Sequence, residues 1–187
     1  MKKFSVLIAA ILLSTGIHAQ QLFKELTVLQ LDNEYFSVNG TYFLTYVPGN
    51  SRSMSVYYPT STPVDTLSVE VKNLTEDMPL QHHLAQNGIV FDCLFDRSDT
   101  LMINVNYRYR HTGNQAIYFF PFVRNNQKPL TEADYLLYID PSVKVKSLSF
   151  PAENELQVGN RIRYHYQKTN FLPQKDFIIF FETEKTK

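Results

Sequence analysis

The strongest constraint on the fold is a strict alternation of apolar and polar positions over residues 101–110. Leu101, Ile103, Val105, Tyr107 and Tyr109 occupy the odd positions, and Asn and Arg side chains occupy most of the even ones. Successive side chains of a β-strand point to opposite faces. The pattern therefore predicts a strand with one face in a core and the other in solvent.

Similar runs along the chain predict about ten or eleven short strands. They cover residues 26–31, 42–47, 54–58, 67–71, 88–95, 101–110, 116–123, 135–140, 143–150, 161–167 and 177–182. The apolar parity changes inside the run 143–150, which predicts a bulge near Ser147. Only residues 80–86 and 131–138 show a weak helical pattern, and the second reads equally well as a strand.

Turn-forming residues separate these runs. They are Asn39-Gly40, Pro48-Gly49-Asn50, Thr62-Pro63, Asn87-Gly88, Thr112-Gly113-Asn114, Asp140-Pro141 and Gly159-Asn160. Many short strands divided by such turns are typical of an antiparallel β-sandwich. The chain is therefore predicted to be all-β, with at most one or two helical turns.

The N-terminus has the order of segments found in secretory signal peptides. Lys2 and Lys3 precede an apolar run at residues 4–13, and a small, polar stretch leads to Ala19. Because that run is too short for a membrane span, we expect a cleaved signal peptide at 1–19 and a single domain at 20–187, located in the periplasm or secreted. The residue directly after the expected cleavage site is Gln20 and not a cysteine, which disfavours a lipid anchor.

Charge and cysteine content exclude some functions. The 187-residue chain is neutral overall, and removal of Lys2 and Lys3 leaves 16 basic and 18 acidic side chains. This balance disfavours binding to nucleic acid, which requires clustered basic residues. Cys93 is the only cysteine, so no intramolecular disulfide forms, and its parity with Phe91 and Phe95 predicts a buried thiol.

No common enzyme signature is present. The sequence lacks metalloprotease histidine spacing, a glycine-rich phosphate loop and a nucleophile elbow. His82 and His83 are adjacent, which favours a surface pair in a loop over a zinc site. We therefore expect no metal and no cofactor. The alternative is a small hydrolase that uses His82, His83, His111 or His165 with a carboxylate such as Asp92 or Asp96.

Two strands carry basic residues on their polar faces. Arg108 and Arg110 belong to one, and Arg161, Arg163 and His165 belong to the other. If these strands were neighbours, their outward faces would form one patch able to bind carboxylates, sulfates or sugar hydroxyls. The other interpretation is an ordinary solvated sheet face with cross-strand ion pairs.

The aromatic run at residues 117–122 supplies two further candidate binding residues, Tyr118 and Phe120. Its apolar side chains fall on both parities, so the strand is either covered on both faces or partly exposed for a partner. Burial in a sandwich core is the ordinary explanation for such aromatics. The absence of Trp counts against a dedicated carbohydrate-binding module.

Three segments together resemble a known family. LMINVNYRYR at 101–110, IYFFPF at 117–122 and ADYLLYIDPSVKVKSLSF at 133–150 follow one another in this order. This order is similar to the all-β N-terminal domain of leucyl or alanyl aminopeptidase-like zinc proteases. The resemblance implies an accessory β-sandwich without the family's zinc-containing domain, and it assigns no catalytic residue.

The expected function is that of a non-enzymatic module outside the cytoplasm. It would bind a protein, peptide or glycan through a sheet face or an exposed edge strand. A structural envelope subunit whose edge strands pair with identical copies is the remaining alternative, besides the hydrolase. The residues do not indicate which partner is bound, nor the oligomeric state.

Overall fold

The computed structural model describes residues 20–61, 68–122 and 128–183 and confirms the all-β class. The expected signal peptide and the Thr62-Pro63 turn lie outside these residues. The strands are β1 (Gln20–Leu31), β2 (Tyr35–Tyr46), β3 (Ser53–Pro59), β4 (Glu70–Asn73), β5 (Met78–Pro79), β6 (His82–Ala85), β7 (Gly88–Leu94), β8 (Thr100–Arg110), β9 (Gln115–Tyr118), β10 (Leu130–Ile139), β11 (Val143–Leu148), β12 (Asn154–Val158), β13 (Arg161–Phe171) and β14 (Phe177–Thr183).

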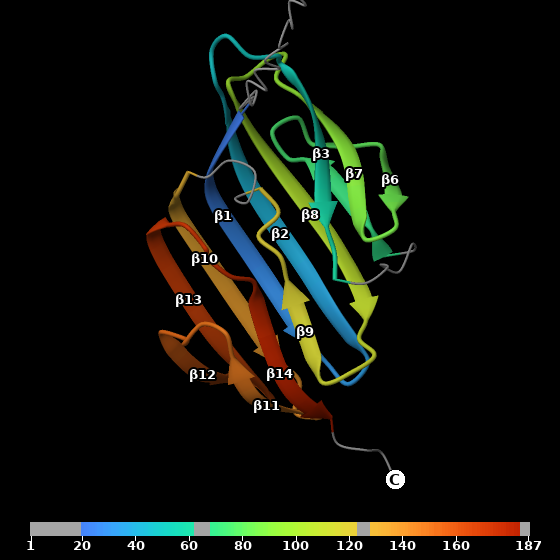
Figure 1. Ribbon diagram of the computed structural model, residues 1–187, viewed down its shortest axis with the longest axis vertical. Coiled ribbons are helices and arrows are strands. Elements are labelled where there is room, and N and C mark those ends of the chain that lie inside the picture. The colour runs from blue at the N-terminus through green and yellow to red at the C-terminus, as the bar shows by residue number, and fades with distance from the viewer. Residues whose placement is uncertain (1–19, 62–67, 123–127, 184–187) are drawn as a thin grey trace, which may run out of the picture.

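The strands form one large and two small sheets (Figure 1). The large sheet has the order β12-β13-β10-β1-β2-β8-β4-β5, and only its β1–β10 pair is parallel. The small sheets, β11-β14-β9 and β3-β7-β6, both lie over the same face of the large sheet. The large sheet therefore has one face in the core and one outer face.

The core between the layers follows the predicted parities. In β8 the odd positions from Leu101 to Tyr109 are buried, and each even position from Met102 onward is partly or fully exposed. Cys93 is buried with Phe91 and Phe95, as predicted. Burial of this apolar surface is the main source of stability, because the described chain contains no disulfide.

The structure has fourteen strands in the described residues, rather than ten or eleven. The additional β5, β6 and β12 are short and have no buried alternation that could reveal them in the sequence. Both weakly helical stretches form strands: residues 80–86 contain β6, and residues 131–138 lie in β10. The bulge near Ser147 is confirmed by a register shift between Val145 and Ser147.

The prediction of a turn at Asn39-Gly40 is wrong, because both residues lie inside β2. The ring of Tyr42 folds back over Gly40, and a Cβ atom at Gly40 would lie 2.2 Å from the Tyr42 hydroxyl. Glycine is therefore required here for close packing and not for a bend. The other predicted turns within the described residues do lie between or at the ends of strands.

Candidate functional site

The predicted arginine patch is divided between two places on the outer face. Arg108 and Arg110 belong to β8, whereas Arg161, Arg163 and His165 belong to β13. The strands β2, β1 and β10 lie between β8 and β13, which separates the two groups by four strand spacings, or about 19 Å. The two strands are not neighbours, so the residues do not form one continuous patch.

Tyr118 and Phe120 lie in the core and not on a binding surface. Their exposed fractions are 0% and 2%. Phe120 packs edge-on against Tyr118 and Tyr135, with ring centroids 5.4 Å and 5.7 Å away. Neither side chain can contact a partner in this structure, so the core interpretation of the aromatic run holds for both.

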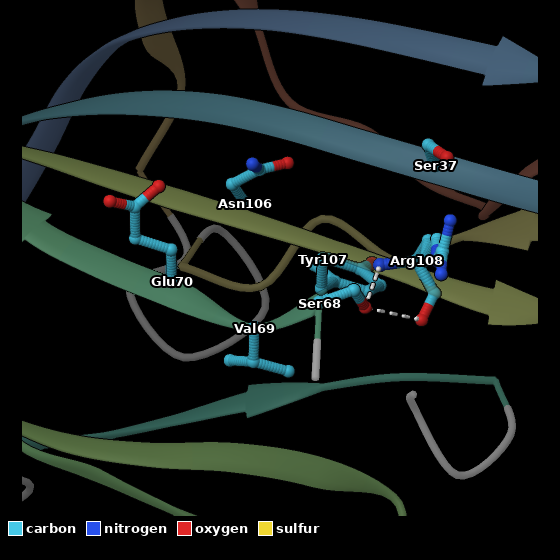
Figure 2. A pocket seen from close by; sticks show the side chains of 7 residues that line it. All are labelled: Ser37, Ser68, Val69, Glu70, Asn106, Tyr107 and Arg108. Carbon is cyan, nitrogen blue, oxygen red and sulfur yellow. Dashed lines mark hydrogen bonds between the residues drawn. The ribbon is translucent and has the colours of Figure 1, made fainter. Parts of the chain in front are cut away.

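At the β8 end of the outer face lies a polar groove of about 630 Å³. Figure 2 shows that it opens where β4 departs from β8, with Glu70 at one end, Arg108 at the other and Asn106 between them. The Ser68 hydroxyl accepts a hydrogen bond from the Arg108 N–H at 3.2 Å and donates one to the Arg108 carbonyl at 3.4 Å. The Ser68 hydroxyl thereby satisfies the two backbone groups of Arg108 that a residue of β4 would otherwise bind.

The groove is lined mainly by groups that donate or accept hydrogen bonds. Glu70 is held by Lys72 at 2.9 Å, and the Arg108 guanidinium lies over the ring of Tyr35, 4.6 Å from its centroid. These contacts fix the two charged side chains at opposite ends. The arrangement suits a small polar ligand with several hydroxyl groups.

At the β13 end, two of the three basic residues have acidic partners. The Nε2 atom of His165 lies 2.9 Å from Oδ1 of Asp134 on β10. Arg161 is 4.0 Å from the Asp140 carboxylate and donates to the Gln30 side chain at 3.5 Å. These contacts are partly exposed and therefore weak in energy, but they engage both Asp134 and Asp140.

Arg163 differs from these neighbours because its guanidinium has no hydrogen-bond or ionic partner among the described residues. Its Nε atom is buried and unsatisfied. Arg163 lies in register between Tyr138 of β10 and Leu156 of β12. An unpaired buried donor costs free energy, and the rest of the guanidinium is left without a partner among the described residues.

Strand β12 beside Arg163 is one edge of the large sheet. All five of its residues are exposed, including Leu156 at 52% and Val158 at 39%. It contains neither Lys nor Pro, the residues that commonly protect such edges. The opposite edge of the same sheet is the two-residue strand β5, which ends at Pro79. Strand β12 is therefore the better edge for pairing with another chain.

The core contains a polar network that the sequence analysis missed. The buried Glu25 carboxylate accepts hydrogen bonds from Thr27 at 3.1 Å and from Tyr118. The Tyr42 hydroxyl continues the network to Tyr118 at 2.9 Å and to Tyr58 at 2.6 Å. Glu25 shares the parity of Leu29 and Leu31, which was the one signal in the sequence that it points into the core.

Burial raises the pKa of Glu25 to about 7, although the hydrogen bonds from Tyr118 and Thr27 lower it. Burial, together with the Glu25 charge, also holds the pKa of Tyr118 well above its usual value. The network joins β1 and β2 of the large sheet to β3 and β9 of the two small sheets. It is closed to solvent and therefore connects the layers rather than forming a ligand site.

The histidines do not assemble a hydrolase site within the described residues. His82 and His83 are exposed and lie on β6, and not in the expected loop. They line a shallow groove of about 360 Å³ with Ser55 and Asp92, but no hydrogen bond joins these side chains. His111 contacts the Asp32 carbonyl at 3.0 Å. No group of three or more His, Cys, Asp or Glu residues in the described chain could hold a metal ion.

The arrangement of the sheets matches a domain known from solved structures. The sandwich has the architecture of the N-terminal domain of M1 zinc metallopeptidases, as the sequence resemblance implied, and the described chain contains no catalytic domain. None of the described segments forms a helix long and apolar enough to cross a membrane. Neither a family model nor a curated protein sequence matches the chain.

Three solved structures illustrate this likeness. A proposed nutrient-binding protein from Legionella pneumophila has a TM-score of 0.66 at 11% identity, over 87% of this chain and 67% of that one. The M1 zinc metallopeptidase of Deinococcus radiodurans has a TM-score of 0.57 at 7% identity, over 87% and 42%. Yeast LTA4 hydrolase has a TM-score of 0.53 at 11% identity, over 88% and 29%.

These likenesses establish the fold alone, because the identities are low. The chain spans less than half the length of the metallopeptidase and hydrolase chains that it matches. The comparison thus describes an all-β fold, and any ligand has to be argued from this chain's own residues.

Proposed function

We propose that the protein is a non-enzymatic module that binds an extended segment of a partner protein by adding it as a strand to β12. The observation that carries this proposal is the fully exposed β12 edge, with Leu156 and Val158 beside an arginine that has no partner. Strand addition gives affinity through main-chain hydrogen bonds and specificity through alternate side chains.

The hairpin geometry indicates which β12 groups are available. Gly159 has a φ of 62°, which suits the first position of a type II′ turn between Val158 and Arg161. In such a hairpin the pair beside the turn is hydrogen-bonded, and bonded and non-bonded pairs then alternate. The backbone groups of Glu155 and Gln157 consequently point away from β13, toward the free edge.

A substitution at Gln157 tests the proposal. Gln157→Pro removes an N–H group at the free edge without removing a bond to β13. We expect a short blocked peptide of alternating Val and Thr with one central Glu to slow amide hydrogen exchange at Glu155 and Gln157 in the purified protein. The proline variant should fold normally and lose peptide binding. Unchanged binding by Gln157→Pro would contradict strand addition at β12.

The proposed site of action is the periplasm or the extracellular space, supported by the secretory pattern of residues 1–19. N-terminal sequencing of the exported protein should begin at or near Gln20. Recovery of the intact N-terminus from the cytoplasm alone would refute this location.

A second candidate function is binding of a small saccharide in the groove of Figure 2. Its volume lies within the usual range for small-ligand sites, and the structural likeness to a proposed nutrient-binding protein supports a ligand of this kind. Titration with chitotriose distinguishes the two functions. Chemical-shift changes at Ser37 and Asn106, without changes at β12, would favour the saccharide.

A further inference from the structure

We propose that Arg163 recognises a carboxylate on the added strand, so that the partner segment carries Asp or Glu between apolar residues. This inference rests on the proposed strand addition and specifies the chemistry of the partner. It follows from the charges around Arg163, from the strand register and from the apolar residues that flank the site.

The carboxylates nearest to Arg163 are held by other side chains. On β13 its same-face neighbours are Arg161 and His165. Arg161 contacts Asp140, and His165 contacts Asp134. On β12 the outer-face positions are Asn154, Leu156 and Val158, none of them acidic. The carboxylates within reach are therefore engaged, and the remaining charge complements an acidic ligand.

The register places Arg163 within reach of an added strand. Arg163 lies directly opposite Leu156, so a partner residue opposite Leu156 would be two strand spacings, or about 10 Å, from Arg163. An extended arginine and a glutamate side chain together span this distance across the top of Leu156. The two terminal nitrogens of the guanidinium can then bind both carboxylate oxygens.

The apolar surface on β12 indicates which residues should flank the acidic residue in the partner segment. Leu156 and Val158 are exposed on the same face as Arg163 and would be covered by apolar side chains on the partner strand. Covering them removes water from the ion pair, which strengthens it relative to a fully exposed pair. The expected partner segment therefore has one acidic residue with Val, Ile or Leu two positions away.

A second copy of this chain fits the site less well. If β12 paired with itself, each Arg163 would meet only Asn154, Leu156 and Val158 of the other copy on that face. None of these provides a carboxylate. The free charge of Arg163 therefore favours a different, acidic segment as the occupant.

Isothermal titration calorimetry with two peptides tests the inference. The first is the Val and Thr peptide with a central Glu, and the second has Gln in its place. We expect the purified protein to bind the Glu peptide about tenfold more tightly, the gain typical of a charge-assisted hydrogen bond. The preference should shrink as NaCl is raised.

Three variants separate the possible outcomes. Arg163→Gln should bind both peptides equally, whereas Gln157→Pro should bind neither. Arg110→Gln is the matched control, since Arg110 lies on the same sheet face but pairs with Glu34 on the far side, and it should keep the full preference. Equal binding of both peptides by the unmodified protein would overturn the role of Arg163 and leave strand addition intact. Failure of both peptides to bind the unmodified protein would overturn strand addition itself.

Discussion

Replacing Glu25 by Gln should remove a pH dependence from the stability of the sandwich. Glu25 is fully buried between the layers, and one of its two carboxylate oxygens has no hydrogen-bond partner among the described residues. Gln has nearly the same shape and carries no charge at any pH. The substitution therefore removes the cost of burying the charge while keeping the packing.

The magnitude follows from the pKa of Glu25. Burial raises this pKa from 4.5 to about 7. The folded protein keeps the proton between pH 4.5 and 7 while the unfolded chain loses it, so the free energy of unfolding falls over this interval and levels off above it. At 1.36 kcal/mol per pKa unit, the loss attributable to Glu25 is about 3 kcal/mol.

Urea unfolding followed by far-ultraviolet circular dichroism at a series of pH values measures this effect. The free energy of unfolding of Glu25→Gln relative to the unmodified protein should rise by about 3 kcal/mol from pH 4.5 to pH 8. Glu132→Gln, at a partly exposed position paired with Lys24, should show little such change. A difference between Glu25→Gln and the unmodified protein that stays constant over this range would refute the reasoning.

Two further predictions concern the core. Gly40→Ala should destabilise the protein by about 2 kcal/mol or more, because its Cβ would lie 2.2 Å from the Tyr42 hydroxyl. Thermal unfolding should show no comparable loss for Gly113→Ala, where no atom lies within 4 Å of the added Cβ. Burial raises the pKa of Cys93 to about 12, so the folded protein should resist a thiol reagent at pH 8 and react only once unfolded. Rapid labelling of the folded protein would contradict the buried position of Cys93.

The division of residues between core and solvent could be predicted because it is a local property. Period-two alternation placed the odd positions of residues 101–110, and Cys93 with its neighbours, on the buried face, and the structure agrees. The parity change near Ser147 likewise predicted the bulge between Val145 and Ser147. These features depend on the geometry of a single strand.

The candidate site could be predicted only in part. The sequence placed Arg161, Arg163 and His165 on one strand face, but it could not show that three strands separate β8 from them. It also gave no sign of β12, because a short strand exposed at an edge has no buried alternation. The unpaired state of Arg163 depends on cross-strand neighbours, and these are set by register.

By itself, the sequence determined the all-β class, the buried face of the strands with a clear alternation and the secretory pattern of the first residues, because strand periodicity and local composition are encoded within short segments. Only the tertiary structure decided which strands are neighbours, that Asn39-Gly40 continues a strand beneath Tyr42, and that Glu25 meets tyrosines from several strands. These outcomes arise from contacts between residues far apart in the chain, where packing overrides the local preference of any one segment.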